Sequence, residues 1–179
     1  MKKLYVVRHC KAAGQTVEAP LTAEGFEQAE SLADFLEGVG AQQLVASQFL
    51  RAVQSLEPLA KRLGLEIRQD ERLGERVLSA RDELNWMEML KAAYEDLDLC
   101  YEGGESGRTV MNRALAAVQD ILATDAEITV LASHGGLCTH LLKAYDDSFG
   151  FESWKVLSNP DVYLLTFDGD AVQVERVWN

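Results

Sequence analysis

The sequence contains little cysteine, proline or histidine, and the scarcity of cysteine limits what the chain can be. Three of its 179 residues are cysteine, three are proline and three are histidine. Cys10, Cys100 and Cys138 are too few and too scattered for a disulfide framework, and no CxxC pair is present. This usage predicts a reducing, cytoplasmic setting.

Positive charge and long apolar runs are also scarce. The chain has 17 Lys and Arg against 29 Asp and Glu, a net charge of -12. We therefore expect neither nucleic acid nor an anionic membrane as a partner, because the overall field repels polyanions, although a local arginine cluster can still bind a small anion. The apolar run 4–7 is too short for a signal peptide, and no run approaches the roughly 20 residues of a membrane span. The sequence does not indicate which oligomeric state the protein adopts.

The composition, 47% hydrophobic and 26% charged, is that of a globular domain, which we expect to span residues 1–179. Apolar runs and helical stripes alternate, and the segment 77–105 is expected to be an irregular, partly helical cap over the active site. Residue Pro58 is expected to kink or split its helix, and residues 145–160 to be rich in loops. The expected strands are 4–7, 44–46, 65–68 and 128–131, followed by a hairpin of 162–167 and 171–178; the expected helices are 22–37, 50–63, 106–122 and 137–144. This order predicts an α/β three-layer sandwich with a mostly parallel central sheet flanked by helices.

Functional residues of such sheets gather where parallel strands end. The first strand runs into Arg8 and His9, and the fourth into His134. The second ends at Ser47, with Arg51 one helical turn further on. Two of the three histidines therefore follow strands at the same edge of the predicted sheet.

These residue types suit a phosphoryl group. A neutral imidazole such as His9 is a competent nucleophile toward phosphorus, and Arg8 and Arg51 offer planar forks for phosphate oxygens. His134 is expected to donate a further hydrogen bond, together with backbone N–H groups at the helix starts near residues 49 and 136. A leaving alkoxide also needs a proton, from a carboxylic acid or another histidine.

Six motifs, in order along nearly the whole chain, resemble those of the histidine phosphatase superfamily, the phosphoglycerate mutase-like family. They are Arg8-His9-Cys10, Leu21-Thr22-Ala23-Glu24-Gly25-Phe26-Glu27-Gln28-Ala29, Ser47-Gln48-Phe49-Leu50-Arg51-Ala52-Val53-Gln54-Ser55, Arg72-Leu73-Gly74-Glu75-Arg76, Gly103-Gly104-Glu105-Ser106 and Ser133-His134-Gly135-Gly136. The resemblance implies the phosphoglycerate mutase-like fold and an enzyme that uses no metal and no cofactor.

The resemblance also implies the roles of individual residues. His9 would be the transiently phosphorylated nucleophile, and Arg8, Arg51 and His134 would form the phosphate pocket. Glu75 would protonate the leaving group and then activate water; Glu83 is the alternative that the sequence leaves open. Gly135 is a further candidate substrate contact, in the last motif.

The chain departs from the family pattern beside the nucleophile. Cys10 replaces the usual glycine, either as a small neutral side chain, which we favour, or as a reactive thiol. The loop 11–19 lacks the family's Asn-rich phosphate-contacting segment, and Gln15 or Thr16 is the candidate replacement. His140 is interpreted as an ordinary helical residue. The apolar group at residues 84–94 is either core or the wall of a substrate pocket.

We expect a phosphomonoester phosphatase that acts on a small phosphorylated substrate. A phosphoglycerate mutase-type phosphotransferase needs more basic residues for a second phosphate, and only Arg76 and Arg81 are obvious candidates. A protein-phosphohistidine phosphatase is the other enzymatic alternative, although such enzymes often lack the acid that Glu75 supplies. A non-catalytic phospho-ligand binding module and a metal site built from His9, Cys10, His134 and Cys138 are the remaining alternatives.

Overall fold

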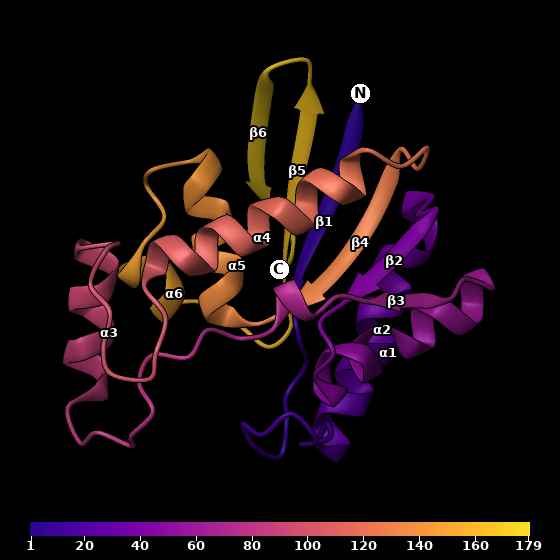
Figure 1. The fold of residues 1–179 in the computed structure, drawn as a ribbon. Coiled ribbons are helices and arrows are strands. Elements are labelled where there is room, and N and C mark those ends of the chain that lie inside the picture. Colours follow the sequence, from indigo (N-terminus) through magenta and orange to yellow (C-terminus); the bar gives the residue numbers. More distant parts are fainter.

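The computed structural model describes all residues 1–179 and contains one mixed sheet (Figure 1). Its six strands lie in the order β3-β2-β4-β1-β5-β6. The four strands β1 to β4 pair in parallel, whereas β5 lies antiparallel to both β1 and β6. The strands are β1 (Lys2–Arg8), β2 (Gln43–Ala46), β3 (Ile67–Gln69), β4 (Ile128–Ser133), β5 (Asp161–Asp168) and β6 (Ala171–Arg176).

Helices cover both faces of the sheet. They are α1 (Ala23–Leu36), α2 (Leu50–Leu63), α3 (Trp86–Glu95), α4 (Gly107–Leu122), α5 (Gly135–Tyr145) and α6 (Phe151–Lys155), with 3-10 turns η1 (Glu37–Val39) and η2 (Glu71–Leu73). None of them has both the length and the apolar character that crossing a bilayer requires.

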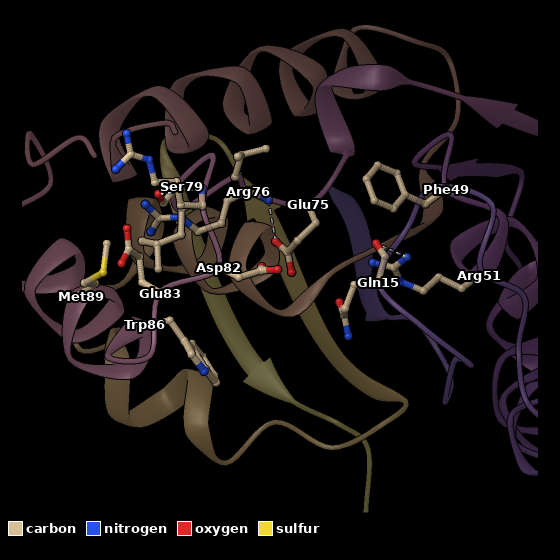
Figure 2. Close-up of a pocket in the computed structure, with 13 residues that line it drawn as sticks. Gln15, Phe49, Arg51, Glu75, Arg76, Ser79, Asp82, Glu83, Trp86 and Met89 are labelled. Carbon is tan, nitrogen blue, oxygen red and sulfur yellow. Dashed lines mark hydrogen bonds between the residues drawn. The ribbon is translucent and has the colours of Figure 1, made fainter. Parts of the chain in front are cut away.

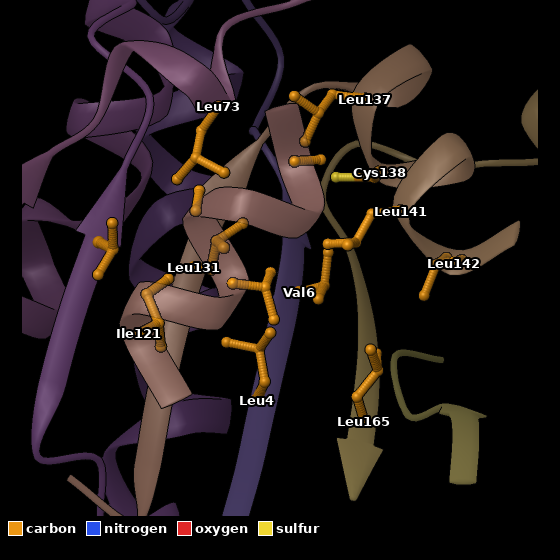
Figure 3. Packing of buried hydrophobic residues seen from close by; sticks show 14 of the residues in the cluster. Leu4, Val6, Leu73, Ile121, Leu131, Leu137, Cys138, Leu141, Leu142 and Leu165 are labelled. Atoms are coloured by element: carbon orange, nitrogen blue, oxygen red, sulfur yellow. The ribbon is translucent and has the colours of Figure 1, made fainter. Parts of the chain in front are cut away.

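The three layers follow from strands that are apolar on both faces. Successive side chains of a strand point to opposite faces. Leu4 and Val6 therefore join a buried cluster beneath α4 and α5, which Figure 3 shows together with Leu131. Tyr5 and Val7 join a second cluster beneath α1 and α2. This arrangement confirms the predicted α/β sandwich.

One local expectation is wrong. Helix α2 runs unbroken through Pro58, because its buried face, including Leu56 and Leu59, packs against the sheet and outweighs the lost hydrogen bond. The stretch 145–160 is rich in loops as expected, and within it lies the short helix α6, in which the rings of Phe151 and Trp154 stack 5.8 Å apart. Strand β4 is also longer than expected, reaching Ser133.

The predicted meeting of strand ends is confirmed by the register of the sheet. Arg8 at the end of β1 pairs with Ser133 at the end of β4, and Ala46 at the end of β2 pairs with Ala132. The residues that follow these three strands therefore start from one edge of the sheet.

Candidate active site

His9 is buried at this edge, and both ring nitrogens have partners. Nδ1 lies 2.6 Å from the Cys10 carbonyl oxygen, to which only a protonated Nδ1 can donate. The opposite nitrogen, Nε2, accepts a 3.2 Å hydrogen bond from Nε of Arg51. Burial lowers the pKa of His9 from 6.5 to about 4, and the positive charges of Arg51 and Arg8 act in the same direction. The ring is therefore neutral near pH 7, with its lone pair on Nε2.

His134 lies beside His9, with the two ring centroids 5.2 Å apart. Its Nε2 is 2.7 Å from the hydroxyl oxygen of Ser47, and burial lowers its pKa well below 6.5. Its Nδ1 is buried and has no hydrogen-bond partner in the protein. Because buried ring nitrogens are normally satisfied, this nitrogen is available to a bound group.

Arg8 and Arg51 carry positive charge that no carboxylate neutralises. Arg8 donates to the carbonyl oxygen of Leu157 at 2.9 Å, and its Nε is buried without a partner. Arg51 is only 1% exposed and donates to His9 and to two carbonyl oxygens of the loop after β1. Neither arginine takes part in an ion pair. A buried, unpaired guanidinium next to a second one favours an anionic ligand.

The Leu21–Ala29 motif fixes the loop that follows His9. Thr22 caps α1 by accepting from the Gly25 amide at 3.0 Å. A side chain at residue 25 would place Cβ 2.1 Å from the Lys11 carbonyl oxygen, so only glycine allows α1 this close to the loop. The amide of Lys11 in turn donates to Gln28 Oε1 at 2.8 Å. The conformation of the loop is thus determined by α1.

Cys10 faces the interior. Its side chain is fully buried in the cluster under α1 and α2, and its amide donates to Ser55 Oγ at 2.9 Å. Burial raises the pKa of the Cys10 thiol to about 11. A thiol in this state is a poor nucleophile, which favours the neutral, space-filling interpretation over the reactive one.

The carboxylate of Glu75 lies at the start of α5. Its Oε2 accepts from the Gly136 amide and its Oε1 from the Leu137 amide, both at 3.1 Å, and Oε1 also accepts from the Arg76 amide at 2.8 Å. A Cβ at residue 136 would lie 2.7 Å from Oε1, so a side chain here would push the Glu75 carboxylate out of this position. The expectation that the amides beyond Gly136 serve the phosphate is wrong, because Glu75 takes them. At α2 the Leu50 amide is likewise taken, by the Val17 carbonyl oxygen.

A cavity of about 660 Å³ connects Arg51 and Glu75 with the segment after Glu75. Figure 2 shows Arg51, Gln15 and Phe49 at one end, Glu75 in the middle, and Trp86 at the other end. His9, Arg8 and His134 do not line the cavity, but Arg51, which does, contacts His9 through its Nε. The full lining is Gln15, Phe49, Arg51, Glu75, Arg76, Val77, Leu78, Ser79, Arg81, Asp82, Glu83, Trp86 and Met89.

The remaining candidates differ in their placement. Gln15 lines the cavity, and its carbonyl oxygen accepts from Arg51. Thr16 contacts Arg51 through its own carbonyl oxygen, 2.8 Å from Nη1, and lies outside the lining. Gly135 opens α5, where a Cβ would sit 3.2 Å from the Nε of Arg8. Glu83 lines the cavity together with Glu75.

The apolar segment 84–94 divides between both expected roles. Trp86 and Met89 line the cavity, whereas Tyr94 is buried. Tyr94 stacks on His140, with centroids 4.6 Å apart, and His140 lies on helix α5 as expected, fully buried in the core. Burial lowers the pKa of His140 to about 4.

Two residues near the site carried no sequence signal. The side-chain amide of Asn159 donates to the carbonyl oxygen of His9 at 2.8 Å and so fixes the backbone of His9. Trp154, on the unexpected helix α6, packs edge-on against Trp86 at 6.2 Å. Both lie in the stretch expected to be loop, where no motif indicated them.

The histidine and cysteine side chains named as a possible metal site do not converge. The chain contains no cluster of three or more His, Cys, Asp or Glu side chains in metal-binding geometry. The sulfur of Cys138 is directed at the Val7 carbonyl oxygen, and the thiol of Cys10 is buried in the other core cluster.

Comparison with known proteins identifies the class. The family model for the histidine phosphatase superfamily (branch 1) matches residues 4–179. The chain therefore belongs to this superfamily. Its relatives include phosphatases and phosphoglycerate mutase-like proteins.

Individual relatives include both kinds. "Probable phosphoglycerate mutase GpmB" of Enterobacter sp. (strain 638) is 30% identical over 154 residues, which cover 75% of this chain and 70% of that protein. Mycobacterial glucosyl-3-phosphoglycerate phosphatase, solved with inorganic phosphate, is 26% identical with a TM-score of 0.80, covering 100% of this chain and 97% of that one. Bacillus stearothermophilus YhfR is 25% identical with a TM-score of 0.82, covering 98% and 96%.

Proposed function

We propose that the protein is a phosphomonoester phosphatase that acts through a phosphohistidine on His9. The observation that carries this proposal is the neutral His9 ring, whose Nδ1 proton is held by the Cys10 carbonyl oxygen while Nε2 faces Arg51. Two unpaired arginines beside a neutral imidazole suit a dianionic phosphoryl group. The mechanism requires no metal or cofactor.

In the first step Nε2 of His9 attacks phosphorus and the ester P–O bond breaks. Arg51 gives up its hydrogen bond to Nε2 and binds a phosphoryl oxygen instead, with Arg8 on a second oxygen. His134, protonated on Nδ1 and accepting from Ser47 at Nε2, donates to the charge that spreads over the oxygens. Arg51 and His134 are buried and Arg8 is partly buried, which strengthens their interaction with the charge.

Glu75 completes both steps. As a carboxylic acid it gives its proton to the leaving oxygen; as a carboxylate it then takes a proton from water, which attacks phosphorus and breaks the P–N bond. Its place supports this role, because it lines the same cavity as Arg51. Glu83 lines that cavity too, but Glu75 alone is held by the helix α5 that follows His134.

The segment 77–105 forms the proposed cap of a single domain, and the cavity beneath it is the proposed site for the leaving group. Supporting this, six of the lining residues lie between Val77 and Glu83 and two more are Trp86 and Met89. A leaving group there meets aromatic and aliphatic walls. Gln15 is the proposed hydrogen-bond partner of the substrate from the opposite side.

The charges of this cavity favour hydrolysis over a mutase reaction. With Arg51 assigned to the phosphoryl group, Arg76 and Arg81 face three carboxylates, of Glu75, Asp82 and Glu83. Arg81 is already paired with Glu102 at 3.3 Å. A second phosphate would therefore find only Arg76 without an ion-pair partner and would be repelled by Asp82 and Glu83. The mutase remains the second candidate because a relative of 30% identity is named as one.

A panel of phosphomonoesters, assayed with and without chelator, tests the proposal. We expect hydrolysis of monoesters with uncharged leaving groups, unchanged by chelator, and only slow transfer between phosphoglycerates. Phosphoglycerate interconversion faster than hydrolysis would support the mutase. Binding of phosphorylated ligands without turnover would support the binding module. An E75Q variant that still hydrolyses alkyl phosphates at the wild-type rate would remove Glu75 from its role and revive the phosphohistidine phosphatase alternative.

The setting of the enzyme is inferred from its thiols. All three cysteines are free, and two of them, Cys10 and Cys138, are buried far from any disulfide partner. We infer a cytoplasmic phosphatase that acts on a small phosphorylated substrate.

A further inference from the structure

The proposed mechanism gives no role to the motif Gly103–Ser106. This motif nevertheless places the carboxylate of Glu105 directly beside the chain that follows Glu75. Gly103 has φ +72°, and a Cβ there would lie 2.3 Å from Cβ of Ala80. A Cβ on Gly104 would lie 2.1 Å from the Leu78 carbonyl oxygen. The two glycines therefore let this turn lie directly against residues 77–80, an approach that side chains would prevent.

Glu105, the third residue of the motif, binds the chain immediately after Glu75. Its amide donates to the Val77 carbonyl oxygen at 2.7 Å, and its Oε2 accepts from the Val77 amide at 3.0 Å. Its own carbonyl oxygen accepts from Nη2 of Arg76 at 3.0 Å. Arg76 is thus held through its side chain, and Val77 through both its amide and its carbonyl oxygen.

Arg113, on α4, binds the chain immediately before Glu75. Its Nη1 donates to the carbonyl oxygens of Arg72 and Gly74, both at 2.7 Å. Its Nε and Nη2 donate to the two carboxylate oxygens of Glu105, at 2.8 and 3.1 Å. Both side chains are mostly buried, at 20% and 24% exposure, so this bidentate pair is better shielded from water than the surface ion pairs.

We propose that Glu105 and Arg113 are positioning residues that hold Glu75 where it can protonate the leaving oxygen of a phosphoryl group attacked by His9. Arg113 binds the backbone before Glu75 and Glu105 binds the backbone after it. The amides of α5, in contrast, bind only the carboxylate of Glu75. Misplacing a reacting group by about 1 Å can cost about 100-fold in rate, so such a support matters for catalysis. This inference rests on the proposed role of Glu75 as the acid.

The charges around the pair are compatible with an ionised Glu105. Burial works against ionisation, but the bonds from Arg113 and the Val77 amide, with the charges of Arg113 and Arg76, hold the pKa of Glu105 below its usual range. The pair therefore stays charged throughout the pH range in which the enzyme would be assayed.

The test compares substrates that differ in their need for an acid. An aliphatic phosphate such as glycerol phosphate needs its leaving oxygen protonated, whereas 2,4-dinitrophenyl phosphate does not. We would measure kcat/KM, which reports transfer to His9, for the wild type, E105Q, R113Q, R113K and E75Q. R108Q is the matched control, because Arg108 is also on α4 and pairs with Asp98 on the surface.

For glycerol phosphate we expect about a 100-fold loss in E75Q and about a 10-fold loss in E105Q and R113Q. For dinitrophenyl phosphate all three losses should stay below about 3-fold. R113K, which keeps the charge but not the fork, should lie between R113Q and the wild type, and R108Q should match the wild type. In the double variant E75Q/R113Q, the second change should cost nothing further on glycerol phosphate.

Equal losses on both substrates in E105Q or R113Q would mean a general structural role and would overturn the inference. Additive losses in E75Q/R113Q would overturn it too, because the pair would then act independently of Glu75. An E75Q variant without any preference for the activated substrate would instead refute the acid role of Glu75. If R113Q failed to fold, E105Q and R113K would decide the question with the same two substrates.

Discussion

The neutral state of His9 has a measurable effect on stability. In the unfolded chain its pKa is about 6.5 and in the folded chain about 4, so between these values the unfolded state binds more protons. The contribution is therefore complete above about pH 6.5 and is lost as the pH falls toward 4. One pKa unit corresponds to about 1.4 kcal/mol, so the whole loss is about 3 kcal/mol.

An H9N variant isolates this contribution. Asparagine retains an N–H for the Cys10 carbonyl oxygen but does not titrate, while His140 stays in both proteins and cancels. His134 also stays, but the charge of His9 helps to lower the pKa of His134, so the difference between the two curves includes that coupling. Between pH 7 and pH 5 the free energy of unfolding of the wild type should fall by about 2 kcal/mol more than that of H9N. Urea unfolding at several pH values, followed by tryptophan fluorescence, measures both curves. Parallel curves would mean that folded His9 titrates near its ordinary pKa, and the neutral-nucleophile argument would fail.

Three further outcomes follow from the site. A thiol reagent at pH 7 should modify the exposed Cys100 rapidly and the buried Cys10 and Cys138 only on unfolding, because burial raises the pKa of both buried thiols; fast loss of three thiols in the native protein would contradict this. G136A should lower kcat/KM for alkyl phosphates at least 10-fold, because its Cβ would displace Glu75, with little change for dinitrophenyl phosphate; equal loss on both substrates would contradict the displacement. Prolonged dialysis against a chelator should leave full activity, whereas activity restored only by added metal ions would refute a metal-independent mechanism.

The sheet and its functional edge were predictable because they depend on local patterns. Short apolar runs such as residues 4–7 indicated strands buried on both faces, and parallel strands must end at a common edge. His9 and His134 follow such strands, so their proximity followed from topology alone. The family motifs then added Glu75, which no spacing argument could select from the other acidic residues.

The parts that were not predictable depend on contacts between distant segments. The Glu105–Arg113 pair becomes visible only when α4 is placed beside the chain around Glu75. The loss of the α5 amides to Glu75 likewise depends on where one side chain points. Helix α6 is short, and it is defined by the stacking of Phe151 on Trp154 rather than by a periodic pattern.

The central claim is the covalent phosphohistidine on His9, and a burst experiment with E75Q tests it most directly. Dinitrophenyl phosphate needs no acid to transfer its phosphoryl group, whereas hydrolysis of the resulting phosphohistidine needs Glu75 as base. Rapid mixing should therefore release up to one equivalent of dinitrophenolate per active site, followed by slow turnover, with acid-labile, base-stable phosphate on His9 in the quenched protein. Steady turnover without a burst, or phosphate on any residue other than His9, would contradict the account.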